Sequence, residues 1–363
     1  MRGLLTVVAM CAGMSVSEAV IAQGTKVISE PALNKTCLKS DIDINKLNKA
    51  IKWISDSKPN LHSLLVNYCG QTILEDYFFG YDSIMPHDLQ SATKTVTSML
   101  IGIALYEGVI KSVDQPLSEL LPDYADLLKG DKAKITLRQV LDMTTGLEWR
   151  DFRKGNSFEL IAEATDSVEF VLSRPLVSKP GEVFYYNTGS SHLLSAIIAT
   201  NTGMSTLEYA EKKLFGPMEM FDYEWDTLRD NIHLGGWGLY LRPRDMVKIG
   251  RMILDGGTWN GKRFIDEAYI EQATQKQVAT GGGPGGNGYG FQMWILDDQA
   301  FDDIAAARGY GGQNIFVIDK LDMVIVTTAS VESHQKNDAD IMHLLSQYVI
   351  PAHSGQMREH RKQ

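Results

Sequence analysis

The chain has 363 residues, of which 44% are apolar and 22% charged, and its formal net charge is −10, from 35 basic and 45 acidic side chains. This composition excludes a disordered chain, which is poorer in apolar residues, and it shows no low-complexity or collagen-like bias. The length fits roughly two domains, and because the balance is acidic we expect no nucleic-acid partner.

The N-terminus has the pattern of a targeting segment. Met1-Arg2 is followed by an apolar stretch from Gly3 to Val16 and by small residues that end at Ala22. A positive start, a short apolar core and small residues before a cut are typical of a secretory signal. We therefore expect residues 1–22 to be removed on export, residues 23–43 to form an extension, and the mature protein to be periplasmic or secreted. A buried N-terminal helix is the alternative. No stretch reaches the roughly 20 apolar residues of a membrane span.

Cysteine and histidine content bears on compartment and cofactors. Removal of the signal leaves Cys37 and Cys69, which in an oxidising compartment either form one disulfide or stay unpaired. The sequence has no Cys-x-x-Cys and no His-Glu-x-x-His, so we expect no metal. Gly281–Gly286 matches Gly-x-Gly-x-x-Gly, but Pro284 interrupts it and a strand pattern follows instead of a helix. A surface loop is favoured there over a nucleotide site, and we expect no cofactor.

The first third of the chain predicts a helix, a hairpin and a second helix. Apolar residues recur at helical spacing over residues 44–57. Two strand-like runs follow, at residues 61–68 and 72–79, with a Gly-containing turn between them. A strong amphipathic helix then runs from Ser91 to Glu107 and is stopped by Gly108.

The rest of the chain changes from helical to strand character. Short helical patterns and Pro- or Gly-marked loops fill the middle, and helices are expected at residues 190–200, 242–254 and 338–349. Strand-like runs gather near the C-terminus at residues 289–296, 303–307, 315–318 and 323–328.

Strands at both ends of the chain, with helices between them, predict an α/β (α+β) fold. Residues 44–108 and 242–350 would form one sheet domain with flanking helices. Residues 109–241 would be a mostly helical insertion, and residues 351–363 a polar tail.

The most informative short motif is Ser91-Ala92-Thr93-Lys94, at the start of the predicted helix. Residues three apart share a helix face, so the Lys94 amine can reach the Ser91 hydroxyl. A serine needs a base to become a nucleophile, and a lysine serves as one when burial lowers its pKa. Taken alone the motif is weak, because a capping serine beside a solvated lysine has the same pattern.

A second motif, Tyr185-Tyr186-Asn187, precedes the helical pattern at residues 190–200. A loop that presents Tyr185 and Asn187, two residues apart, can direct both side chains into one cleft. The phenol would relay a proton and the amide would bind a substrate carbonyl. A turn tyrosine packed on a domain seam is the alternative interpretation.

Together, in this order, the two motifs resemble those of the penicillin-recognising serine hydrolases, in particular the class C β-lactamase-like branch with its esterases, D-amino-acid peptidases and 6-aminohexanoate-dimer hydrolase. The similarity extends to Leu61–Val66, Glu75–Phe78, Thr136–Leu147, Leu214–Met218, Leu239–Met246 and Gly288–Gln292. It implies a β-lactamase/transpeptidase-like fold, with an antiparallel sheet, flanking helices and an inserted helical domain.

The resemblance also implies roles for individual residues. Ser91 would be the nucleophile, Lys94 its base, Tyr185 the proton relay and Asn187 a substrate-positioning residue. The oxyanion hole would use the backbone N–H groups of Ser91 and Ala307. The chain departs from the family at the third motif, Lys-Thr-Gly, where it has Ala305-Ala306-Ala307-Arg308-Gly309-Tyr310-Gly311-Gly312-Gln313 instead. The cation that meets a β-lactam carboxylate is absent unless Arg308 turns inward.

These observations predict an exported serine hydrolase that cleaves a small-molecule amide or ester through an acyl-enzyme, without metal or organic cofactor. A D,D-peptidase or penicillin-binding protein is one alternative. A non-catalytic ligand-binding or sensor module of the same fold is another, and the four polar side chains of the two motifs weigh against it.

Overall fold

The computed structural model describes residues 42–57, 60–151, 156–282, 286–296 and 303–353. The predicted signal at residues 1–22 lies outside these residues, as do nearly all of the extension and the tail. Cys69 is disulfide-bonded, in line with the disulfide alternative, whereas Cys37, its partner in that alternative, lies outside the described residues. No helix in the described part of the chain is long and apolar enough to cross a membrane.

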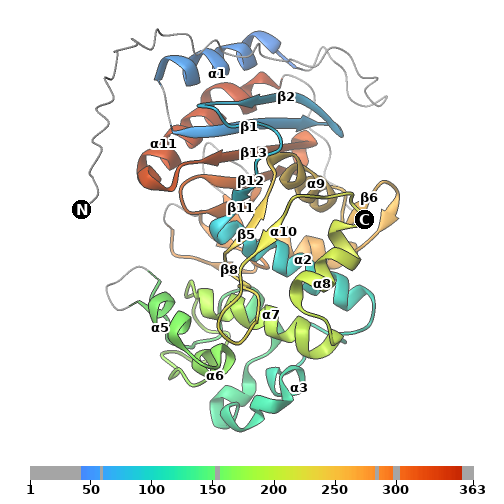
Figure 1. Cartoon of the computed structure of the whole chain (residues 1–363), viewed down its shortest axis with the longest axis vertical. Helices are drawn as coiled ribbons and strands as arrows, with labels where there is room; N and C mark the ends of the chain where they lie inside the picture. Colours follow the sequence, from blue (N-terminus) through green and yellow to red (C-terminus); the bar gives the residue numbers. More distant parts are fainter. Residues whose placement is uncertain (1–41, 58–59, 152–155, 283–285, 297–302, 354–363) are drawn as a thin grey trace, which may run out of the picture.

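An eight-stranded antiparallel sheet is built from both ends of the chain, in the order β2-β1-β13-β12-β11-β10-β9-β8 (Figure 1). Its strands are β1 (Leu61–Tyr68), β2 (Gln71–Tyr77), β8 (Val278–Ala279), β9 (Gly288–Tyr289), β10 (Trp294–Leu296), β11 (Ile304–Gly309), β12 (Gln313–Ile318) and β13 (Met323–Ala329). The first strand lies beside the last, with Leu65 opposite Val326. The predicted α/β class is confirmed.

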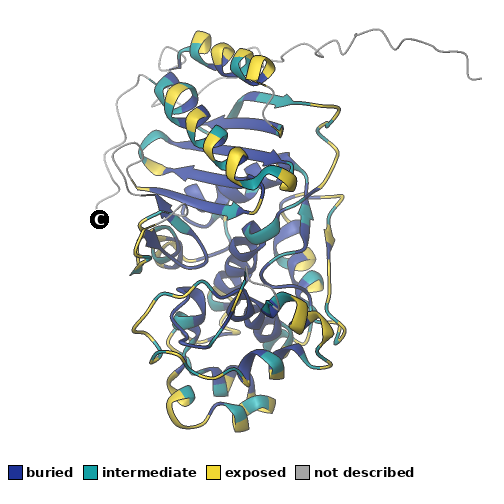
Figure 2. Ribbon diagram, turned by 90° about the vertical axis from the view of Figure 1, so that its left-hand side faces the viewer, coloured by how far each residue is buried: buried dark blue, intermediate teal, exposed yellow. Residues whose placement is uncertain are grey.

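Helices cover both faces of this sheet. Helices α1 (Ile44–Ser57) and α11 (His334–Leu344) pack on one face, against Val66, Ala306 and Phe316. Helices α2 (Thr93–Tyr106), α9 (Pro243–Leu254) and α10 (Glu267–Thr274) lie on the other, whose core includes Ala305, Ala307 and Val326. Because side chains alternate along a strand, neighbouring residues of β11 serve the two different cores. Figure 2 shows the buried sheet and the exposed outer surfaces of the covering helices.

The middle of the chain is mostly helical and shares one core with the sheet. Its helices are α3 (Leu117–Leu120), α4 (Leu137–Leu141), α5 (Ser157–Glu163), α6 (Ser167–Leu172), α7 (Thr188–Thr202) and α8 (Thr206–Ala210). Small sheets join β3 (His87–Asp88), β5 (Leu239–Leu241) and β4 (Glu224–Trp225), and β6 (Thr258–Trp259) with β7 (Lys262–Arg263). A continuous apolar cluster runs from Ala305 in the sheet to Trp149 and Leu172. The exact domain boundaries therefore stay a prediction.

Several predicted elements differ in detail from the structure. Helix α2 is not amphipathic, because every residue from Thr93 to Ala104 is buried between the sheet and the helical part. The predicted strand at residues 289–296 is a hairpin of β9 and β10, reversed at Gln292, whose φ is 60°. The last helix begins earlier than expected, at His334, and widens into a π-helical turn at Leu345–Val349. The helix at residues 44–57 is confirmed with the predicted bounds.

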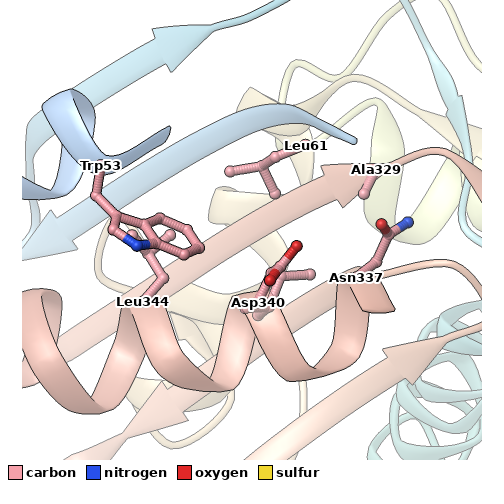
Figure 3. Close-up of a pocket in the computed structure, with 7 residues that line it drawn as sticks. Trp53, Leu61, Ala329, Asn337, Asp340 and Leu344 are labelled. Carbon is pink, nitrogen blue, oxygen red and sulfur yellow. The ribbon is translucent and has the colours of Figure 1, made fainter. Parts of the chain in front are cut away.

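A small cavity lies between the sheet and the helices on the α11 side (Figure 3). It has a volume of about 10 Å³ and is lined by Trp53, Leu61, Ala329, Asn337, Asp340, Ile341 and Leu344. A single buried water needs roughly 10–15 Å³, so this cavity is too small for an organic ligand.

Helix α9 approaches the sheet closely at Gly250. A Cβ atom there would lie 2.5 Å from Val324 Cγ1 and 2.7 Å from Ile315 Cγ2. We predict that Gly250→Ala destabilises the fold by about 1–3 kcal/mol, because overpacking outweighs the helix-propensity gain of alanine. Thermal unfolding measures the change. The control Asn48→Ala, exposed on α1, is expected to stay within about 0.5 kcal/mol of the native chain. An unchanged melting temperature for Gly250→Ala would contradict the close packing.

Candidate active site

Ser91 lies in a tight turn that opens helix α2. The 3₁₀ turn η2 (Gln90–Ala92) leads directly into the helix. Gln90 has φ 49°, a left-handed conformation that is uncommon for a residue other than glycine. Its N–H donates to Asp88 Oδ1 at 2.8 Å, and the Leu89 N–H donates to the Leu239 carbonyl at 2.8 Å. These bonds to β3 and β5 hold the turn, and with it Ser91, at a defined place.

The Lys94 amine is buried beside the Ser91 hydroxyl. Its side chain is 1% exposed, and Nζ lies 3.0 Å from Ser91 Oγ and 2.9 Å from the Gly236 carbonyl oxygen. Burial lowers the pKa of Lys94 to about 7, while the Asp151 carboxylate opposes this shift. A large fraction of the amine is therefore neutral near pH 7 and can accept the Ser91 proton. The predicted Ser91–Lys94 contact is confirmed.

The carbonyl that contacts Lys94 depends on two adjacent glycines. A Cβ on Gly235 would lie 2.4 Å from the Ser191 carbonyl oxygen, and one on Gly236 would lie 2.6 Å from Thr188 Cγ2. The Thr97 hydroxyl donates to the Gly235 carbonyl at 2.8 Å. Glycine allows the segment to pass between α2 and α7, which brings the Gly236 oxygen to Lys94. A Gly-Gly pair in the sequence gave no sign of this role.

Tyr186, and not Tyr185, faces Ser91. The Tyr185 side chain is 42% exposed, and its hydroxyl donates to the Trp149 carbonyl at 2.6 Å. By contrast, the Tyr186 side chain forms a hydrogen bond with Ser91, and the Lys94 Nζ lies 4.9 Å from the centre of its ring. Successive side chains of an extended segment point to opposite sides, so only one of two neighbouring tyrosines can face the serine. The prediction that placed Tyr185 at the site is wrong.

The Tyr186 phenol is protonated near neutral pH. Burial raises its pKa well above the ordinary value, and the hydrogen bond with Ser91 only partly opposes this. A protonated phenol in contact with Ser91 and close to Lys94 can donate its proton to the leaving group of a substrate whose carbonyl carbon Ser91 attacks. The two consecutive tyrosines were the available sequence signal, but the motif spacing selected the wrong one.

Asn187 caps helix α7 instead of facing a ligand. Its Oδ1 accepts from the Ser190 N–H at 2.9 Å, and its Nδ2 donates to the Leu147 carbonyl at 3.0 Å. The side chain is 1% exposed. The structure therefore corrects the predicted substrate-positioning role, because the amide already binds within the fold. As the N-cap it fixes where α7 begins, directly after Tyr186.

Ala307, the predicted second oxyanion donor, lies in β11 on the face of the sheet that α2 covers, and the strand approaches the Ser91 turn further along, at Gly309. A Cβ on Gly309 would lie 2.1 Å from the Leu89 carbonyl oxygen. Strand β10 pairs with β11 only as far as Ala306, so in the described part of the sheet this edge is unpaired from Ala307 onward. Arg308 forms an ion pair with Asp338 of α11, on the opposite face of the sheet. It does not turn toward Ser91.

Asp151 is a charged residue near the site that the sequence analysis missed. Trp149 Nε1 donates to Asp151 Oδ1 at 2.7 Å, and the Trp149 ring packs against Gly189, where a Cβ would lie 2.3 Å from the ring. Burial raises the pKa of Asp151, and Lys94 lowers it. No group of three or more His, Cys, Asp or Glu side chains in the described residues is arranged to hold a metal.

Comparisons with known proteins cover most of the chain. The sequence model of the Beta-lactamase family matches residues 62–348. The 6-aminohexanoate-dimer hydrolase of Paenarthrobacter ureafaciens is 24% identical over 292 residues, which span 72% of this chain and 70% of that protein. A solved structure from Bacillus anthracis, provisionally named a 6-aminohexanoate-dimer hydrolase, has a TM-score of 0.66 at 25% identity and covers 81% of each chain. A family VIII carboxylesterase shares the fold, with a TM-score of 0.67 at 14% identity over 88% of this chain and 99% of its own.

The low pKa of Lys94 predicts how the reactivity of Ser91 depends on pH. If the neutral amine acts as the base, the rate of Ser91 modification by a fluorophosphonate should rise about tenfold per pH unit below pH 7 and level off above it. Asp151 favours the charged amine, so Asp151→Asn should move the midpoint to lower pH. Labelling rates across pH 5–10 measure both effects. A midpoint near pH 10 would show that Lys94 is not desolvated.

Proposed function

Because this chain belongs to the Beta-lactamase family and is a serine hydrolase of the β-lactamase and penicillin-binding protein superfamily, we propose that it cleaves an amide or ester bond through an acyl-enzyme on Ser91. The observation that carries the proposal is the buried Lys94 amine, 3.0 Å from Ser91 Oγ, with the Tyr186 phenol hydrogen-bonded to the same serine. A nucleophile, a base and a proton donor thus meet at one oxygen.

In the proposed acylation, neutral Lys94 takes the proton of Ser91 as Oγ attacks the substrate carbonyl carbon. The tetrahedral intermediate collapses when the C–N or C–O bond breaks, and Tyr186 gives its proton to the departing nitrogen or oxygen. Lys94 then returns its proton to the Tyr186 phenolate. The lysine amine is neutral again, and the acyl group is held as an ester on Ser91. Water then attacks that ester with the same base, releases the carboxylic acid and restores the Ser91 hydroxyl.

The oxyanion of that intermediate needs two backbone donors near Ser91 Oγ. The Ser91 N–H lies at the start of α2, where amide groups lack intrahelical partners. We propose that the second donor comes from the end of β11, at Gly309 or Tyr310, in place of Ala307. The contact of Gly309 with the Leu89 carbonyl and the open strand edge beyond Ala306 support this shift.

The same strand supports a substrate without an essential carboxylate. Strand β11 has alanine at positions 305 to 307, and its cation, Arg308, is held by Asp338 on the far face of the sheet. An anion bound beside Ser91 would therefore meet no side chain of β11 that carries a positive charge. This favours amidase or esterase activity over true β-lactamase activity.

We also propose that the protein works outside the cytoplasm. The support is the signal-like pattern of residues 1–22 together with the disulfide at Cys69. Disulfides persist in oxidising compartments and are rare in the cytosol.

Removal of the nucleophile tests the proposal directly. We predict that Ser91→Ala loses fluorophosphonate labelling and that turnover falls by several orders of magnitude, on the order of 10⁶ when a serine nucleophile is removed. The assay screens short acyl esters, D-amino-acid amides and nitrocefin with both proteins. Equal labelling of the two would refute the assignment. Ligand protection against heat, without turnover of any substrate, would instead indicate a binding module.

The paired tyrosines supply a matched test of the proton donor. Tyr186→Phe removes the hydroxyl beside Ser91 and should lower kcat/KM by about 10²–10⁴ for substrates with poor leaving groups. Tyr185→Phe removes a hydroxyl of the same kind that binds only the Trp149 carbonyl, and should stay within about threefold of the native rate. The reverse order of effects would restore Tyr185 as the relay.

A further inference from the structure

Four aromatic rings, one of them that of Tyr186, form a cluster, and they come from two separate segments. The loop before α7 contributes Phe184 and Tyr186, and the β9–β10 hairpin contributes Tyr289 and Trp294. The ring of Trp294 stacks on that of Tyr186, with centroids 5.4 Å apart and planes 17° apart. Tyr289 meets Tyr186 edge to face at 6.4 Å and Trp294 at 5.0 Å. Phe184 contacts Tyr289 at 5.2 Å and Trp294 at 5.9 Å.

The hairpin that carries Trp294 is held firmly at both of its ends. At the turn, Gln292 Nε2 donates to the carbonyls of Val140 and Leu141, and its Oε1 accepts from the Ser191 hydroxyl at 2.7 Å. The Thr95 hydroxyl donates to the Gln292 carbonyl at 2.8 Å. On the sheet side, Trp294 lies opposite Ala306 of β11. The indole is therefore presented from a framework that includes α2, the nucleophile helix.

Tyr186, in contrast, lies in a loop outside the helices and strands, so the regular backbone hydrogen bonding of a strand does not fix its ring. Its hydroxyl must nonetheless stay within hydrogen-bonding reach of Ser91, with Lys94 4.9 Å from the ring centre. A misplacement of about 1 Å at a reacting group can cost on the order of 10²-fold in rate. A stacked aromatic neighbour restricts the ring plane and adds roughly 0.5–1.5 kcal/mol beyond its apolar area.

From this geometry we propose that Trp294 is a positioning residue for Tyr186: the indole fixes the plane of the phenol so that its hydroxyl meets the nitrogen or oxygen that departs from the substrate carbonyl carbon. The inference rests on the proposed proton-donor role of Tyr186. It assigns to Trp294 no contact with the reacting atoms. Trp294 would act on the reaction only by orienting the stacked ring of Tyr186.

A positioning role has a consequence that depends on the substrate. Tyr186 protonates the leaving oxygen, and a poor leaving group such as an alkoxide needs that proton far more than a nitrophenolate does. Loss of the Trp294 ring should therefore slow alkyl esters much more than nitrophenyl esters of the same acid. Mere loosening of the fold would slow both kinds of ester alike.

The experiment measures kcat/KM for a series of esters with one acyl group and alcohols of increasing basicity, from 4-nitrophenol through phenol and trifluoroethanol to ethanol. The proteins are the native chain, Trp294→Leu, Trp294→Phe, Tyr186→Phe and the double variant Tyr186→Phe/Trp294→Leu. Trp53→Leu is the matched control, because Trp53 also packs on rings, His343 at 5.1 Å and Tyr348 at 6.4 Å, but on the other side of the sheet. Melting temperatures are recorded for all variants.

We expect Trp294→Leu to lose on the order of 10²-fold on the ethyl ester and less than about threefold on the nitrophenyl ester, with KM nearly unchanged. Trp294→Phe keeps a ring and should recover most of that loss. In the double variant, Trp294→Leu should lower kcat/KM almost no further than Tyr186→Phe alone, because both substitutions remove the same proton-donor function. Trp53→Leu should lower the melting temperature without changing the dependence on the alcohol.

The results separate the two hypotheses. A loss for Trp294→Leu that is equal across all alcohols, or multiplies with that of Tyr186→Phe, would overturn the positioning role while leaving Tyr186 as donor. A rise in KM with unchanged kcat would do the same and would mark Trp294 as a substrate contact. If Tyr186→Phe itself shows no dependence on the alcohol, the proposed role of Tyr186 falls, and the inference falls with it.

Discussion

The burial of one amine organises this site. Lys94 is almost completely removed from solvent, and its Nζ is left with an oxygen on each of two segments, Ser91 and Gly236. Removing an ammonium group from water in such a place has a large unfavourable free energy, and this desolvation lowers the pKa of Lys94 to about 7. In the proposed mechanism this lower pKa makes Lys94 usable as a base near neutral pH. The segments of Ser91 and Gly236 are among those that enclose the amine.

The enclosure is assembled from distant parts of the chain. The turn η2 supplies the serine and helix α2 the lysine. The Gly235-Gly236 pair passes close enough to α7 to bring up a carbonyl, and the loop before α7 brings Tyr186. The β9–β10 hairpin stacks Trp294 on that tyrosine. Strand β1, from the first part of the described chain, pairs with β13 from its last part. The candidate site thus lies where the sheet and the helical part share one core.

Much of the fold was predictable because its signals are local. The helix at residues 44–57 follows from apolar spacing, and the strands β1, β12 and β13 follow from apolar, β-branched or aromatic runs between turn residues. The predicted elements were wrong where tertiary packing, and not the local pattern of apolar and polar residues, decides the structure. Helix α2 has buried threonines and serines on every side, so polarity did not show that it is central. The β9–β10 reversal occurs at Gln292, whose left-handed backbone is stabilised by side-chain bonds to α4 and α7 that no local rule anticipates.

The sequence by itself determined the chemical pair, since Ser91 and Lys94 are three residues apart and any helix brings them together. It also identified the family and showed that the third motif, Lys-Thr-Gly, is absent. Only the tertiary structure decided which tyrosine faces the serine, because that choice depends on the direction of each side chain in an extended loop. Likewise it showed that Asn187 is a helix cap and that β11 meets the nucleophile turn at Gly309. These are contacts between segments far apart in the chain, and residue order alone does not encode their register.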